Sequence, residues 1–194
     1  MDLLPAVVTL FLVMDPLGNV PVFLSVLKTV DPQRRRFVLV RELLIAYGVL
    51  IAFLLLGNSM LRFLGLKTEA VGIAGGIVLF LIALRMIFPD HGSPSGEQID
   101  GEPFVVPLAI PFVAGPSALA TLLLLQSAPS VTSASLMIAM TIAWLITGVI
   151  LLSSTFLYRV LGERGLIATE RLMGMLLVMV AVQMLLNGLR TSLR

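Results

Sequence analysis

Cysteine is absent from this chain of 194 residues, and histidine occurs once, at His91. The absence of cysteine excludes disulfide bonds, thiolate catalysis and metal sites ligated by cysteine. The sequence also lacks a Walker motif, an H-E-x-x-H pair and a G-x-S-x-G elbow, so ATP hydrolysis and membrane proteolysis by those routes have no support. We therefore predict that the protein is not an enzyme and that it has no metal site and no bound cofactor.

Charged residues are scarce as well. They make up 12% of the chain, against about 25% in a typical soluble domain. Hydrophobic residues reach 58% and the mean hydropathy is +1.07, which indicates an integral membrane protein with the lipid bilayer as its main partner. The net charge of +2 comes from 13 Lys and Arg against 11 Asp and Glu. It is too small to indicate binding to nucleic acid, so we expect none.

The apolar segments predict an all-α fold with several membrane-spanning helices. A helix crosses the hydrocarbon core with about 20 apolar residues, and six segments qualify: roughly 3–27, 38–57, 68–88, 103–126, 134–157 and 168–189. The first has no basic residues before it and no cleavage site after it, so we expect it to be retained. The polar, Gly- and Pro-rich stretch 89–102 separates a unit of residues 1–88 from a unit of residues 103–194.

The positions of Lys and Arg predict the orientation in the membrane. Loops one, three and five and the helix ends beside them carry nine of these residues: Lys28, Arg34, Arg35, Arg36, Arg41, Arg85, Arg159, Arg164 and Arg171. The opposite side carries four: Arg62, Lys67, Arg190 and Arg194. Because basic residues accumulate on the cytoplasmic side, we expect both termini to lie outside.

The two units show traces of an internal repeat. A P-x4-P pattern occurs at Pro16 and Pro21 and again at Pro111 and Pro116, an offset of 95. Further matches have offsets of 97 (Leu64-Gly65 with Leu161-Gly162) and 98 (Gly76, Ala83 and Met86 with Gly174, Ala181 and Met184). Since each unit has an odd number of spans, a second copy lies upside down in the membrane. The sequence thus predicts two inverted three-helix repeats, an arrangement found in many secondary transporters.

Both proline motifs predict broken helices, the first and the fourth of the bundle. Proline removes a helical hydrogen bond, and the freed backbone groups must line a cavity or be buried against protein. We expect half-helices to begin near Asn19–Pro21 and near Pro116–Ser117. Their N-termini suit an anionic group and the freed carbonyls suit a cation, which together fit a small zwitterion such as an amino acid. The structural alternative is a pair of kinks relieved by Ser and Thr side chains.

Polar residues within the motifs are the candidate binding groups. Asp15 lies deep in the first span, where a carboxylate costs about 2.5–3.5 kcal/mol. It is either a proton-coupling residue, an N-cap of the following half-helix, or both. Asn19 is likewise a cap or a ligand. The other candidates are the backbone at Gly18 and Gly115 and the hydroxyls of Ser117 and Thr121, which alternatively bond local carbonyls. Arg41 and Glu42, at the start of the second span, are interpreted as an interfacial pair or as charges at a helix N-terminus.

Several longer stretches resemble the MarC-related family of bacterial inner-membrane proteins. These stretches are MDPLGNVPVFL, RELLIA, GIAGGIVLFLIALRMIF and VPLAIPFVAGPSALATLLLL, and the resemblance extends from about Leu4 to Leu189. The segments MIFP and ERLMG are similar to those of the enterobacterial-type branch. The family is also called the neutral amino acid transporter family and is grouped with the lysine-exporter superfamily.

The resemblance implies a six-helix protein of the inner membrane that moves small neutral amino acids such as glycine, alanine, serine or threonine. It also implies coupling to H⁺ or Na⁺. Its two signature stretches fall on Asp15–Pro21 and Pro111–Pro116. We therefore predict a secondary transporter that works by alternating access around the two broken helices, and a homo-oligomer is compatible with the small size. The alternatives are a passive channel, an exporter of another small solute, and a membrane scaffold that transports nothing.

Overall fold

The computed structural model of the protein describes residues 3–28, 30–88, 108–127 and 131–192, and these residues form helices and connecting turns without a strand. The elements follow one another as α1 (Leu3–Met14), α2 (Pro16–Lys28), α3 (Arg35–Phe63), α4 (Thr68–Ile87), the π-helical segment η1 (Leu108–Val113), α5 (Pro116–Gln126), α6 (Ser133–Leu152) and α7 (Ser154–Ser192). The expected all-α class is therefore confirmed for the described residues. The predicted linker 89–102 lies outside them.

Five stretches of the described chain are long and apolar enough to cross a membrane: Leu3–Leu27, which contains both α1 and α2, and the helices α3, α4, α6 and α7. Helix α5 is also apolar, but it has only 11 residues. It belongs to the fourth predicted span, 103–126, of which residues 103–107 are not described. These lengths and compositions are those of an integral membrane protein.

Some predicted boundaries are wrong. Helix α3 has 29 residues and extends beyond both ends of the expected span 38–57. Helix α6 ends at Leu152, and the last residues of the expected span 134–157 belong to α7, which starts well before the expected residue 168. A bend at Gly162 (φ 65°, ψ 177°) divides α7. Glycine adopts this geometry easily because it has no Cβ. Hydropathy did not locate this bend, because the bend depends on the backbone torsions of a single residue.

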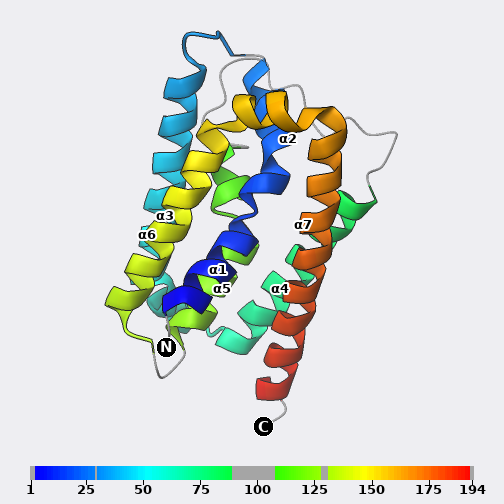
Figure 1. The fold of residues 1–194 in the computed structure, drawn as a ribbon. Helices are drawn as coiled ribbons and strands as arrows, with labels where there is room; N and C mark the ends of the chain where they lie inside the picture. The colour runs from blue at the N-terminus through cyan, green and yellow to red at the C-terminus, as the bar shows by residue number, and fades with distance from the viewer. Residues whose placement is uncertain (1–2, 29, 89–107, 128–130, 193–194) are drawn as a thin grey trace.

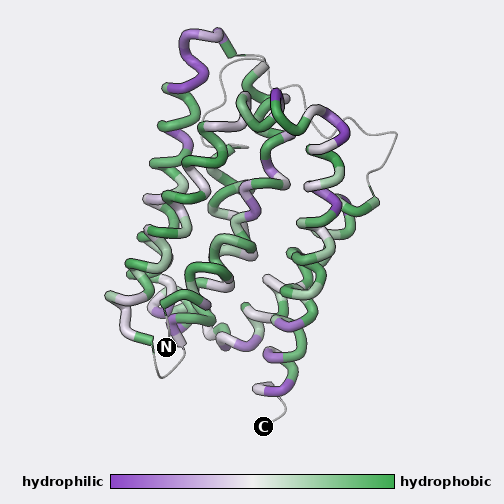
Figure 2. Tube along the Cα trace, viewed as in Figure 1, coloured by the Kyte–Doolittle hydropathy of each residue, from purple (hydrophilic) through white to green (hydrophobic). Residues whose placement is uncertain are grey.

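The long helices run back and forth through one bundle, and both termini lie at the same end of it (Figure 1). Helix α4 packs along α7, α1 packs on α6, and α2 packs on α7. In the same way η1 packs on α3 and α5 packs on α4. Apolar residues predominate along the helices (Figure 2), and large apolar side chains such as Leu4, Phe63 and Phe156 are exposed. An apolar outer surface suits helices that contact lipid.

Glycines allow α4 to approach its neighbours closely. A Cβ atom added at Gly75 would clash with Cβ of Ala120 in α5. A Cβ at Gly76 would lie 3.1 Å from the carbonyl oxygen of Ala181 in α7, and one at Gly174 would lie 3.0 Å from that of Ala83. Small residues at such contacts let membrane helices gain van der Waals packing.

We expect Gly75→Ala to destabilise the bundle by about 1–3 kcal/mol, because a methyl group in a filled interface forces the two backbones apart. Gly48→Ala in α3 is the matched control, since a Cβ there has nothing within 4 Å. It should be neutral or stabilising by up to about 1 kcal/mol. Thermal unfolding of both purified variants in detergent checks this, and equal midpoints would show that the Gly75 contact is not tight.

Candidate functional site

The first junction in the fold is Asp15, which lies between α1 and α2. Its φ is 42°, the one positive φ among the described residues other than glycine. Its Oδ1 atom accepts a hydrogen bond of 3.2 Å from the backbone N–H of Gly18. Asp15 is thus an N-cap bonded to the third residue of α2, and Pro16 occupies the first helical position, where a missing N–H costs nothing. The side chain is buried, with 6% of its surface exposed.

The expected start of the half-helix near Asn19–Pro21 is wrong, because α2 begins at Pro16 and continues through Pro21. The capping bond and the proline at the first position favour the earlier start. Pro21 has no N–H to offer one turn back, so the Leu17 carbonyl loses its usual helical partner. The motif therefore frees a backbone acceptor without ending the helix at Pro21.

The second junction runs from Ile110 to Gly115. Ile110 is extended (φ −127°, ψ 127°) within the π-helical segment η1, and the N–H of Ala114 bonds to the carbonyl of Ala109 at 2.9 Å. Gly115 is extended (φ −77°, ψ 166°) and precedes α5, whose first residue is Pro116. No side chain caps this helix. Helix α5 therefore begins where the sequence predicted it, with uncapped N–H groups in its first turn.

Asn19 connects the two junctions. Its Nδ2 atom donates to the carbonyl of Met14 at 3.0 Å and to the carbonyl of Phe112 at 3.1 Å. Met14 is the last residue of α1, and Phe112 belongs to η1. Both neighbours are carbonyl oxygens, so the amide nitrogen must face them and Oδ1 points elsewhere. Among the described residues, no group donates to Oδ1. One side chain thus bonds the end of α1 and also a residue that is 93 positions further along the chain than Asn19 itself.

Gly18 completes the first junction. A Cβ atom there would clash with Oδ2 of Asp15 and with Cε of Met86 in α4. The absent side chain lets the capping carboxylate fold back onto α2, and it brings α4 against the same turn. Asp15, Gly18 and Asn19, all predicted as site residues, therefore lie together and meet the segment that leads to Gly115.

Two other predicted residues have separate surroundings. Thr121 is buried, and its hydroxyl lies 3.7 Å from the sulfur of Met184 in α7. Ser117 is buried in the first turn of α5. No hydrogen bond joins either hydroxyl to Asn19 in the described structure. The side chain of Pro111 is outside the described part of the molecule.

Glu42 is more deeply buried than its place near the start of a span predicted. Only 1% of its side chain is exposed, and its predicted pair with Arg41 is present. Its Oε1 atom accepts two hydrogen bonds from Arg41, from Nε at 3.2 Å and from Nη2 at 3.0 Å. Its buried Oε2 atom has no hydrogen-bond partner in the described structure. The signal was present, because Glu42 shares the four-residue spacing of the buried Ala46, Leu50 and Leu54.

Comparisons with known proteins agree with this architecture. A family model described as MarC family integral membrane protein matches residues 2–193. The chain is 54% identical over 190 residues to the UPF0056 inner membrane protein YhgN of Escherichia coli (strain K12), covering 97% of this chain and 96% of that protein. It is 47% identical to a UPF0056 membrane protein of Buchnera aphidicola subsp. Schizaphis graminum, covering 97% and 96%.

The similarity extends to an archaeal protein. A UPF0056 membrane protein of Pyrococcus abyssi is 33% identical over 192 residues, which cover 94% of this chain and 92% of the relative. No solved structure matches. The names of these relatives give a location in the membrane and no substrate or reaction.

Proposed function

The chain belongs to the MarC family of integral membrane proteins, and from this premise we propose that it is a secondary transporter of small neutral amino acids of the glycine, alanine, serine and threonine type. Solute would bind where the two junctions meet and cross by alternating access. The observation that carries the proposal is the amide of Asn19, bonded at once to Met14 and Phe112. Because this side chain bonds both segments, a movement of one relative to the other would break at least one of its hydrogen bonds.

An inverted repeat is the second part of the proposal, and the packing supports it. In such a repeat, η1 and α5 correspond to α1 and α2, α6 corresponds to α3, and α7 corresponds to α4. The packing of α1 on α6 then has its equivalent in the packing of η1 on α3, and the packing of α2 on α7 in that of α5 on α4. The pair formed by α4 and α7 is its own equivalent. The non-helical residues Asp15 and Ile110 are 95 positions apart, and the positive-φ residues Gly65 and Gly162 are 97 apart. These are the offsets of the sequence repeat.

The chemistry of the junctions favours a zwitterion. The uncapped first turn of α5 presents N–H groups and the positive end of a helix dipole, which suit a carboxylate. The Leu17 carbonyl and the free Oδ1 of Asn19 are acceptors, which suit an ammonium group. Asp15 is the acid at the same place, and we assign it the coupling of solute to H⁺ or Na⁺. We expect Gly18, Gly115, Ser117 and Thr121 to shape or line the site.

We place the protein in the bacterial inner membrane with both termini outside. One relative is named an inner membrane protein, and the start of α3, where the arginine run 34–36 falls, lies at the end of the bundle opposite the termini (Figure 1). Basic residues favour the cytoplasmic side. The proposed transport function is compatible with a homo-oligomer and does not depend on one.

A non-transporting scaffold is the second candidate, and a specific observation favours it. Asp15 caps α2, both N–H groups of Asn19 are bonded to carbonyls, and Thr121 lies on Met184. These polar groups thus have structural partners without a solute. A channel is the third candidate, and it differs from a carrier in lacking saturation and counterflow.

Ligand-dependent stability separates a solute-binding protein from a scaffold. A ligand that binds only the folded state stabilises it by about 2.7 kcal/mol at 100 times its Kd. We expect the unfolding midpoint of the purified protein to rise with alanine, glycine, serine or threonine and to stay constant with aspartate or lysine at equal concentration. A midpoint that none of the neutral amino acids moves would favour the scaffold.

A further inference from the structure

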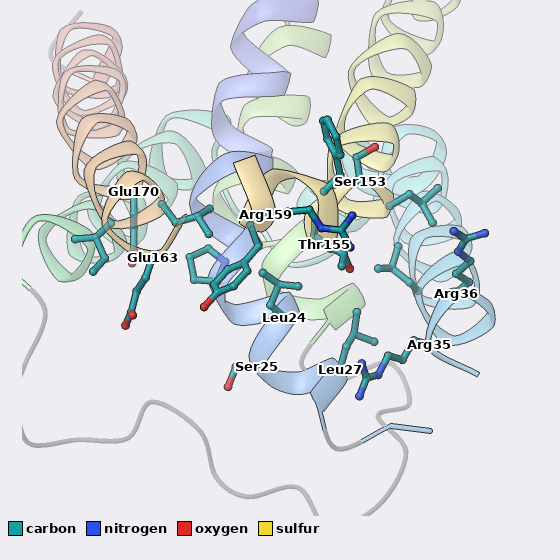
Figure 3. Close-up of a pocket in the computed structure, with 18 residues that line it drawn as sticks. Leu24, Ser25, Leu27, Arg35, Arg36, Ser153, Thr155, Arg159, Glu163 and Glu170 are labelled. Atoms are coloured by element: carbon teal, nitrogen blue, oxygen red, sulfur yellow. The ribbon is translucent and has the colours of Figure 1, made fainter. Parts of the chain in front are cut away.

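A cavity of about 830 Å³ opens at the arginine-rich end of the bundle. Its walls come from α2, the start of α3, the end of α6 and the first part of α7 (Figure 3). Pro21 and Leu24 contribute the wall from α2. Pro21 follows Asn19 by two positions in the same helix, so the cavity reaches the helical turn of Asn19, although Asn19 itself does not line it.

The charged residues of this cavity have both signs. Arg35, Arg36 and Arg159 line it together with Glu163 and Glu170 (Figure 3). An anion alone would meet two carboxylates here, and a cation alone would meet three guanidinium groups. A small molecule with one group of each sign finds partners for both, because charge-assisted hydrogen bonds form with either.

At the opposite end of the bundle the described residues form a smaller hollow. It has about 390 Å³ and is lined by residues between positions 58 and 69, from the end of α3 and the start of α4. Helix α5, which corresponds to α2 in the proposed repeat, packs closely against α3 and α4. A Cβ at Gly57 would clash with Leu123, one at Gly75 would clash with Ala120, and Gln126 donates to the carbonyl of Leu54 at 2.8 Å.

The two ends therefore differ although the repeat relates them. Arg62 in the small hollow and Arg159 in the large cavity are 97 positions apart, the offset already found for Gly65 and Gly162. In the large cavity the wall includes the half-helix that follows a junction, and in the small hollow it does not. This is the difference expected between the open and closed sides of one alternating-access state.

We propose that the cavity is the entrance of the solute path on the arginine-rich side, that it admits a small zwitterion, and that this structure is the state open to that side. The proposal rests on the proposed transport function. In the alternate state, α5 separates from α3 and α4 at the other end, while α2 closes the cavity.

The absence of cysteine from the chain makes labelling a direct test. We would introduce Ser25→Cys in α2 and Thr155→Cys in α7, two residues that line the cavity from different helices. Gln33→Cys is the control, since Gln33 is exposed at the same end and does not line the cavity. Each variant, in inside-out and right-side-out membrane vesicles, would react with an impermeant maleimide with and without alanine or serine.

The expected result is labelling of all three variants from the arginine-rich side, slowed several-fold by alanine or serine only in Ser25→Cys and Thr155→Cys. Unslowed labelling in vesicles whose wild-type protein shows counterflow would overturn the entrance and leave the proposed function intact. Unslowed labelling without wild-type counterflow would count against both. Labelling that responds to the phosphatidylglycerol content of the vesicles and not to the amino acids would identify a lipid headgroup site and overturn the inference.

Discussion

Replacement of Asp15 by asparagine is expected to leave the protein folded and to uncouple transport from the proton gradient. Asparagine is as good an N-cap as aspartate and tolerates a positive φ, so it can keep the bond to Gly18 and the φ of 42°. It cannot take up or release a proton. Loss of one coupled proton removes about 2.3 kcal/mol per 100 mV, or roughly 40-fold in solute accumulation.

The measurement is uptake of labelled alanine into proteoliposomes with and without an imposed proton gradient, repeated with a sodium gradient. Counterflow without a gradient should persist in Asp15→Asn. Asp15→Ala is the companion variant, because it loses the cap as well and should be less stable by about 1–2 kcal/mol. Full gradient-driven accumulation by Asp15→Asn would remove Asp15 from the coupling mechanism and leave it the role of a cap.

Asn19→Asp is expected to have the second large effect, a loss of both stability and transport. The amide nitrogen of Asn19 faces the carbonyl oxygens of Met14 and Phe112, and a carboxylate offers them only oxygen. Each partly buried acceptor left without a donor costs about 1–3 kcal/mol. The two together should destabilise the protein by roughly 3 kcal/mol, and repulsion between the oxygens should separate the two junctions.

Thermal unfolding and counterflow of the purified variant measure both effects. Asn58→Asp is the matched control, because it makes the same chemical change near the end of α3, in a residue whose carbonyl already accepts from Arg62. A carboxylate four residues before an arginine is favourable on a helix, so this control should keep wild-type stability. Equal behaviour of the two variants would contradict the bridging role of Asn19.

Much of the architecture follows from local sequence. Apolar length located the membrane helices, because a span needs a fixed number of apolar residues. The second proline motif located the start of α5. The first did not locate the start of α2, which begins at Pro16, earlier than predicted, because Asp15 caps it. Hydropathy did not distinguish the end of α6 from the start of α7, because the break at Ser153 has apolar residues on both sides.

The site was predictable only in part. Asp15, Gly18 and Asn19 stand out in sequence because polar residues and glycine are costly in an apolar span. The bond from Asn19 to Phe112 joins residues 93 positions apart, and its partner is a backbone carbonyl, which carries no signature in the sequence. The pair of Arg41 with Glu42 was predicted and is present. The burial of Glu42 was missed, because its place near the start of a span was weighed above the four-residue spacing that it shares with buried residues of α3.

The most direct test of the central claim is counterflow in liposomes that contain the purified protein. Vesicles loaded with unlabelled alanine, glycine, serine or threonine would be diluted into a trace of the same labelled amino acid. A carrier predicts transient, saturable accumulation of label for at least one of the four, and no accumulation in protein-free vesicles. Absence of exchange for all four, from protein that is folded and correctly inserted, would contradict transport of small neutral amino acids.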